Sequence, residues 1–137
     1  MWPQYSQACR IDIDRALRGP LVSAYRSNPK VGVGPSQGSH VYAFERALEK
    51  AWNVKHCVAM NSGTMALVAA IKALRLPPGS EILTTPYSFS ATPASILLAG
   101  HTPRFADVDP YCFTLSAETV RQAITKRTRA LLVVDLF

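Results

Sequence analysis

The sequence has 137 residues, of which 48% are hydrophobic and 18% are charged, and its net charge is +6. This length suits one domain with a core rather than two, and this composition excludes a disordered chain. No run of about 18 apolar residues occurs, so no membrane-spanning helix is predicted.

Basic residues are spread along the chain and cluster only at residues 126–129. The cluster lies between a helical pattern and a strand pattern. We therefore expect a solvated loop there, and no nucleic-acid partner, because a basic stripe with groove-reading elements is missing. The basic balance is compatible with a small anionic substrate but does not require one.

The N-terminus and the cysteines bear on the location of the chain. The first residues lack a basic segment followed by an apolar one, so no secretory signal is expected and the cytoplasm is favoured. Cys9, Cys57 and Cys112 are odd in number and widely spaced. We expect reduced thiols and no metal site, because this spacing matches neither a disulfide framework nor a metal-ligand pattern.

Residues 1–38 are weakly patterned and rich in Pro and Gly. A short helix is predicted at residues 11–17, ending before Gly19. The glycine-rich residues 32–38 are interpreted as a loop. They do not form a dinucleotide-binding fingerprint, because the third glycine comes one residue late, Pro35 interrupts the motif and no clear strand precedes it.

From residue 39 onward, apolar residues recur at helical and strand spacings in alternation. Ser39 is a good N-cap, and Asn53 closes the first helix. Thr92 is the predicted cap of a later helix, with Pro93 at its first position, where a missing N–H has no consequence. In chain order we predict a helix at 39–53, a strand at 56–60, a helix at 65–74, a strand at 81–84, a helix at 92–99 stopped by Gly100, a strand at 103–108, a helix at 116–124 and a strand at 129–136.

Strands that alternate with helices and read as solid apolar runs indicate an α/β fold with a parallel sheet buried on both faces. Such a sheet binds its ligands at the carboxyl ends of its strands. The chain ends at Phe137, directly after the last predicted strand, so a truncated chain is expected. The predicted organisation is an N-terminal arm and loop over 1–38 and a partial large domain over 39–137.

The most informative stretch is 61–67, Asn-Ser-Gly-Thr-Met-Ala-Leu. A small, flexible turn there joins a predicted strand to a predicted helix. The first N–H groups of a helix lack partners, and the helix dipole favours an anion at that end. Residues 61–64 therefore predict a phosphate site, although a Ser-Gly-Thr turn alone is a weak signal.

Residues 61–67 resemble the phosphate turn of the DegT/DnrJ/EryC1/StrS family, the pyridoxal-phosphate-dependent sugar aminotransferases of fold type I. Residues 78–82, Pro-Gly-Ser-Glu-Ile, resemble that family's Pro-Gly-Asp-Glu-Val segment. The further matches, in order and with fitting spacing across 39–137, are at 44–45 with 56–64, 85–92, 99–109 and 124–130. The resemblance implies the N-terminal part of the large domain of such an enzyme, a three-layer fold with a mostly parallel sheet.

The resemblance also implies a cofactor, pyridoxal 5′-phosphate, and residues that bind it. Gly63 and Thr64, in the turn with Ser62, would hold the phosphate through backbone N–H groups and the Thr64 hydroxyl. Phe89 would stack on the pyridine ring. The implied partners are a second copy of the chain in a homodimer, a nucleotide-linked keto-sugar and an amino-acid donor.

Transamination needs a lysine that bonds covalently to the cofactor and an acid that faces the pyridine nitrogen. The resemblance places both beyond residue 137, so no catalytic residue is assigned and these 137 residues alone are not expected to transaminate. Asp135 is not assigned as the acid, because the family's acid lies on a later strand. Asp107 and Asp109 are expected to serve turn and cap formation.

Several functions stay open. The first is the N-terminal portion of an aminotransferase for cell-surface polysaccharide or secondary-metabolite sugars. The second is a non-catalytic product of a truncated gene. A sugar dehydratase of the same family, in which a histidine replaces the lysine, is a further alternative. An unrelated nucleotide-binding α/β module is the weakest, because it would need a glycine-rich fingerprint or a lysine-bearing phosphate loop.

Overall fold

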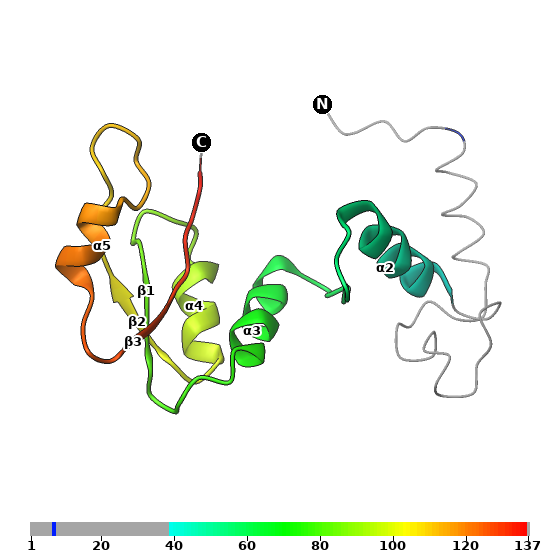
Figure 1. Cartoon of the computed structure of the whole chain (residues 1–137), viewed down its shortest axis with the longest axis horizontal. Coiled ribbons are helices and arrows are strands. Elements are labelled where there is room, and N and C mark those ends of the chain that lie inside the picture. The colour runs from blue at the N-terminus through cyan, green and yellow to red at the C-terminus, as the bar shows by residue number, and fades with distance from the viewer. Residues whose placement is uncertain (1–6, 8–38, 137) are drawn as a thin grey trace. The chain divides into compact units, whose positions relative to one another are not determined.

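The computed structural model describes Gln7 and residues 39–136 (Figure 1). The chain divides into two compact units, Met1–Ala59 and Met60–Phe137. Cys9, the predicted helix at 11–17 and the glycine-rich segment at 32–38 lie outside the described residues. The division into 1–38 and 39–137 stays a prediction. No helix of the described part is long and apolar enough to cross a membrane.

The described part of the first unit contains helix α2 (Ser39–Trp52), as the sequence predicts. Asn53 ends it in the left-handed conformation, with φ 51°, which Asn tolerates better than most residues. The Val54 N–H then donates to the Glu49 carbonyl at 3.0 Å.

The predicted strand at residues 56–60 is wrong: no strand forms, and the Val58 side chain is 68% exposed. The N–H groups of Cys57 and Ala59 instead donate to the carboxylates of Glu49 and Glu45, both at 2.8 Å. Side chains of α2 therefore occupy donors that a neighbouring strand would use. An apolar run becomes a strand only where another strand pairs with it, and the described sheet supplies no such neighbour.

The second unit is an α/β structure with a parallel three-stranded sheet in the order β2-β1-β3. Helices α3 and α4 lie on one side of the sheet and α5 on the other (Figure 1). The fold class predicted from sequence is confirmed. The elements are α3 (Gly63–Ala73), β1 (Glu81–Thr84), α4 (Ala91–Leu98), β2 (Thr102–Phe105), α5 (Ala117–Ala123) and β3 (Thr128–Leu131).

Strands β2 and β3 are shorter than predicted because their shared neighbour is short. β1 has only four residues, and the chain turns away after Thr85. The last bonds along it run from Ala106 N to the Thr84 carbonyl and from Leu132 N to the Leu83 carbonyl, both at 2.9 Å. Beyond these bonds, the Thr84 hydroxyl donates to the Leu132 carbonyl at 2.8 Å, and neither outer strand has a further backbone partner within the described sheet.

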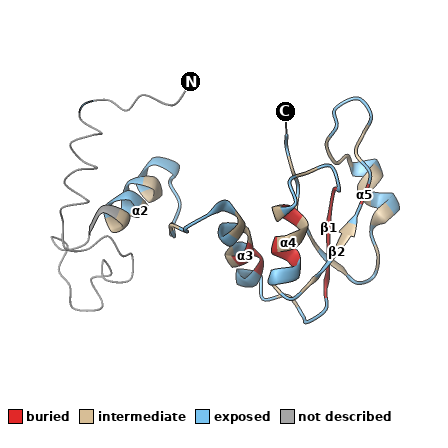
Figure 2. Ribbon diagram, turned by 180° about the vertical axis from the view of Figure 1, so that it is seen from behind, coloured by how far each residue is buried: buried red, intermediate tan, exposed pale blue. Residues whose placement is uncertain are grey.

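Burial follows the same geometry. Every residue of β1 is buried (Figure 2), and Ile82 packs with Ile71 of α3 and Ile96 of α4. The expectation of burial on both faces is wrong for the outer strands, since Phe105 and Leu131 are each 47% exposed. In the described sheet these strands have one strand neighbour instead of two.

Helix α4 differs from its prediction at the start and agrees at the end. Its N-cap is Ser90, and Thr92 lies in the first turn, so the predicted cap is wrong by two residues. Pro93 is still tolerated, because the first-turn N–H groups lack helical partners. At the other end Gly100, with φ 90°, donates to the Leu97 carbonyl while His101 N donates to the Ile96 carbonyl, a Schellman termination.

Helix α5 begins and ends as predicted, and its cap allows a test. The Ser116 hydroxyl accepts from Thr119 N while the Thr119 hydroxyl accepts from Ser116 N, a reciprocal capping box.

Ser116→Ala should lower the free energy of unfolding by about 1 kcal/mol. Ser90→Ala is the matched control, because the Ser90 side chain makes no capping bond and its loss should be much smaller. Urea unfolding followed by circular dichroism measures both, and equal losses would contradict the assignment.

Glu81 joins the start of β1 to the chain that enters β3. Its carboxylate is buried, accepts a hydrogen bond from the Thr125 hydroxyl and pairs with Arg127. The Thr125 bond, and secondarily Arg127, lower the pKa of Glu81 below its ordinary value of 4.5, although burial opposes them.

This lowered pKa predicts a pH dependence of stability. The ionised Glu81 stabilises the fold above the unfolded-state pKa, and this stabilisation should be lost as the pH falls below about 4.5 and through the folded-state pKa. Glu81→Gln should therefore be less stable than the wild type at pH 7, and the difference should shrink toward pH 3. Melting temperatures of both proteins over that range measure it; parallel curves would contradict this role for Glu81.

Candidate cofactor site

The turn at residues 61–64 is arranged as an anion site. Ser62 is the N-cap of α3: its side chain accepts from Met65 N at 3.2 Å, and its carbonyl accepts from Ala66 N at 3.0 Å. The N–H groups of Gly63 and Thr64 precede the first helical bond and have no partner among the bonds recorded for the described residues. Two donors are thus left at the positive end of an 11-residue helix.

A pocket of about 490 Å³ opens directly at this turn. It joins two segments that lie apart in the sequence, because α3 packs against α4. This volume is in the range of small-molecule sites, and the lining is mostly apolar with a few polar groups. The lining residues are Gly63, Thr64, Leu67, Phe89, Ala91 and Thr92.

Gly63 shows that there is room for a ligand group at the turn. A Cβ atom added to Gly63 would meet nothing within 4 Å, so the space over this backbone is open. A phosphate needs unpaired N–H donors and free space in front of them, and the turn supplies both. The residues present therefore fit a phosphorylated ring compound.

Phe89 supplies an aromatic face to the same pocket. It lies on the loop that follows β1, and its side chain is 76% exposed. An exposed aromatic ring on the wall of an apolar pocket is a contact surface for a flat ligand. Three of the four predicted cofactor-binding residues, Gly63, Thr64 and Phe89, thus line one pocket. Ser62 is not in its lining and caps the helix instead, although its hydroxyl hydrogen is free to donate.

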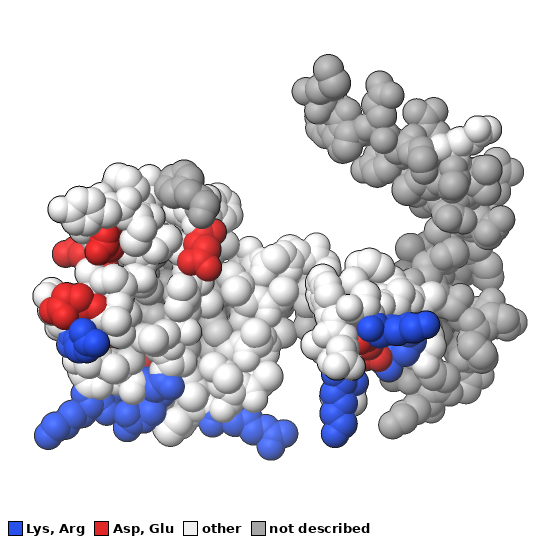
Figure 3. Space-filling model, turned by 45° about the horizontal axis from the view of Figure 1, so that its top comes forward, with Lys and Arg blue, Asp and Glu red and all other residues white. Residues whose placement is uncertain are grey.

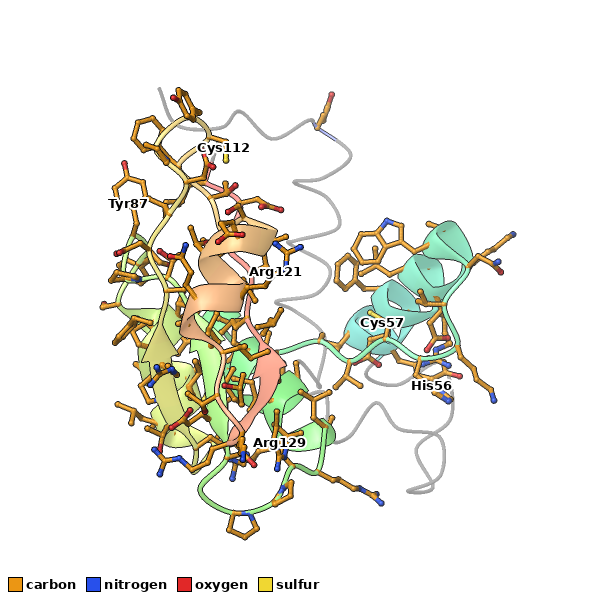
Figure 4. The ribbon with its side chains drawn as sticks, turned by 60° about the vertical axis from the view of Figure 1, so that its left-hand side comes forward. His56, Cys57, Tyr87, Cys112, Arg121 and Arg129 are labelled. Atoms are coloured by element: carbon orange, nitrogen blue, oxygen red, sulfur yellow. The ribbon has the colours of Figure 1, made fainter. Side chains whose placement is uncertain are left out.

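The basic residues do not supply the charge of this site. Most Lys and Arg side chains of the second unit gather at one end of it in Figure 3. Figure 4 places Arg129 at that end, and Tyr87 and Cys112 at the other. Tyr87 lies two residues before Phe89, on the pocket's own loop. The positive charge available to an anion in the pocket is therefore that of the α3 N-terminus, because no lysine or arginine of the described residues lines the pocket.

The other candidate residues lie outside the pocket. Asp109 forms a turn, as predicted, because its carboxylate accepts from Tyr111 N at 2.8 Å. Asp135 is exposed and does not line the pocket. Lys126 and Arg127 occupy an exposed turn, as predicted, whereas Thr128 and Arg129 of the same predicted loop begin strand β3. Cys57 and Cys112 are free thiols (Figure 4), and the described residues contain no cluster of three His, Cys, Asp or Glu suited to a metal.

Sequence reasoning missed part of the pocket. Leu67 and Ala91 line it without a motif of their own. Thr92 was predicted only as a helix cap, yet it lines the pocket and its hydroxyl pairs with Ser88. The signal available was position: residues 85–92 follow the carboxyl end of a predicted strand, where ligands of such sheets bind.

Comparison with known proteins identifies the family of the chain. A model of the DegT/DnrJ/EryC1/StrS aminotransferase family matches residues 30–137. The spore coat polysaccharide biosynthesis protein SpsC of Bacillus subtilis (strain 168) is 39% identical over 99 residues, which are 72% of this chain and 25% of that protein. The chain thus spans about a quarter of the length of this curated relative.

Two solved structures extend the comparison. Helicobacter pylori PseC, an aminotransferase involved in the biosynthesis of pseudoaminic acid, has a TM-score of 0.78 at 27% identity, covering 98% of this chain and 33% of that one. GDP-4-keto-6-deoxymannose-3-dehydratase with a trapped PLP-glutamate geminal diamine has a TM-score of 0.63 at 29% identity, covering 70% and 26%. The fold is therefore that of the fold type I pyridoxal-phosphate enzymes.

Proposed function

Because the chain belongs to the DegT/DnrJ/EryC1/StrS aminotransferase family, we propose that it supplies the cofactor-phosphate and ring contacts of a pyridoxal-phosphate-dependent aminotransferase. The observation that carries the proposal is the pocket that combines the unpaired N–H groups of Gly63 and Thr64 with the exposed ring of Phe89. When bound, pyridoxal phosphate supplies an electron sink for moving an amino group.

The residues of the chain then have distinct tasks. The N–H groups of Gly63 and Thr64, with the Thr64 hydroxyl, donate to phosphate oxygens at the positive end of α3. Ser62 fixes the first turn of that helix by capping it. Phe89 would cover one face of the pyridine ring and exclude water from it, while Leu67 and Ala91 complete the apolar wall of the pocket. This part of the chain binds and orients the cofactor.

The proposed substrate is a nucleotide-linked keto-sugar, with an amino acid as the amino donor and a second copy of the chain as partner. The names of the relatives support it: one acts in spore coat polysaccharide biosynthesis, and one solved relative acts on a GDP-linked keto-sugar. The likeness to a dehydratase also favours a second candidate, a dehydratase of this family. The aminotransferase is preferred because PseC superposes over more of the chain and with a higher TM-score.

Two binding experiments on the full 137-residue chain test the proposal. Pyridoxamine 5′-phosphate has no aldehyde and cannot react with surface lysines, so saturable binding at one site in equilibrium dialysis reports the pocket alone. We expect such binding, with inorganic phosphate as a competitor; its complete absence would contradict the proposed cofactor role.

Treatment with pyridoxal phosphate and then borohydride tests the expectation that the lysine that bonds covalently to the cofactor is not among these 137 residues. None of the described lysines lines the pocket. We therefore expect no stoichiometric, dialysis-resistant absorption band that borohydride reduces, and no transamination by these residues alone. A stable band of that kind, mapped to one lysine by peptide mass, would show that this chain carries the covalent lysine after all.

A further inference from the structure

Phe89 is exposed on the pocket wall, yet the backbone around it is tightly hydrogen-bonded. Tyr87 N donates to the Thr85 hydroxyl at 3.1 Å, and Ser88 N donates to the Pro86 carbonyl at 2.9 Å. The carbonyl of Phe89 accepts from Thr92 N at 3.0 Å. The loop that carries the aromatic ring is therefore held in one shape before any ligand arrives.

One side-chain contact ties this loop to the core. The hydroxyls of Ser88 and Thr92 lie 2.7 Å apart, and Thr92 is only 7% exposed. The carbonyl of Thr92 in turn accepts from the Ser95 hydroxyl at 2.8 Å, and Ser95 is fully buried. The residue immediately before Phe89 is thus joined through Thr92 to the buried face of α4.

We propose that the Ser88–Thr92 hydroxyl pair positions Phe89 against the pocket, and that Ser88 and Thr92 are positioning residues for the cofactor ring. The inference rests on the proposed function for its consequence, but its geometry stands independently. A stacking ring helps binding most when it is already in place, because a mobile side chain must be ordered at the moment of binding. The pair lowers the backbone part of that cost by fixing the chain on the N-terminal side of Phe89.

The first test needs no cofactor. A single 4-fluorophenylalanine at position 89 gives one fluorine resonance that reports the surroundings and mobility of that ring. Thr92→Val, which keeps the shape of the side chain but removes its hydroxyl, should shift and broaden this resonance, and Ser88→Ala should do the same. Thr92→Ser keeps the hydroxyl and should restore the wild-type line. An unchanged resonance in Thr92→Val would overturn the proposal.

The second test measures how the Ser88–Thr92 hydroxyl pair affects the affinity for the ligand. The affinity for pyridoxamine 5′-phosphate should fall about threefold to tenfold in Thr92→Val, the range expected for one lost hydrogen bond. In a Phe89→Ala background the same change should have no further effect, because there is no ring left to position. An equal loss in both backgrounds would show that Thr92 acts independently of Phe89 and would overturn the proposal.

The two claims fail in different ways. If the wild-type chain does not bind pyridoxamine 5′-phosphate, the proposed function is wrong, and the fluorine resonance alone decides whether the hydroxyl pair positions Phe89. Should Thr92→Val fail to fold, Ser88→Ala carries both tests, because Ser88 is less buried and lies on the loop rather than in α4.

Discussion

Thr64→Val should weaken the binding of pyridoxamine 5′-phosphate by the chain about tenfold to a hundredfold. The change keeps the shape of the side chain and removes the hydroxyl of Thr64, the one hydroxyl-bearing residue of the turn at 62–64 that lines the pocket. A hydrogen bond to a charged group is worth about 1.5–3 kcal/mol, and about 1.4 kcal/mol corresponds to a tenfold change in affinity. Equilibrium dialysis measures the loss directly.

The controls for Thr64 separate phosphate binding from folding. Thr64→Ser retains the hydroxyl, and its affinity for pyridoxamine 5′-phosphate should stay within about threefold of the wild-type affinity. That change is much smaller than the loss expected when one hydrogen bond to a charged group is removed. Pyridoxamine without its phosphate should bind wild type and Thr64→Val equally, since in the proposed site the turn contacts only the phosphate. An equal loss for both ligands would mean that Thr64 shapes the pocket instead of binding the anion.

Ile96→Ala should produce the largest loss of stability among these substitutions, about 2–5 kcal/mol in the free energy of unfolding. Ile96 is fully buried on α4 and packs with Ile71 and Ile82, so α3, α4 and β1 meet at its side chain. Removing it leaves a cavity between the two helices that contribute lining residues to the proposed cofactor pocket. Urea unfolding followed by circular dichroism gives the value.

Leu97→Ala is the matched control for Ile96→Ala. It removes an aliphatic side chain from the next position of the same helix, so the change in helix propensity is similar. Leu97 is 61% exposed, so the free energy of unfolding of Leu97→Ala should lie within about 1 kcal/mol of the wild-type value. Similar losses for the two variants would contradict the assignment of Ile96 to the core.

The fold was predictable where local chemistry decides it. Helix ends are set by bonds within a few residues, and the structure confirms three of them: Asn53 and Gly100 end helices, and Ser116 begins one. The alternation of helices and strands was sufficient to predict a parallel α/β fold. The segment at 56–60 failed for the opposite reason: its apolar pattern suits a strand, but strand formation depends on a neighbour that the pattern does not contain.

The candidate site divides in the same way. The sequence alone predicted an anion-binding turn, because the small residues at 62–64 come directly before a helix, whose first N–H groups lack helical partners. It also indicated Phe89, through the resemblance of its segment to a known family. Only the tertiary structure decided that Phe89 and the turn share one pocket, and that Thr92 pairs with Ser88 instead of capping a helix. Those facts depend on the packing of α3 against α4, and packing between segments some 25 residues apart is not encoded in either segment by itself.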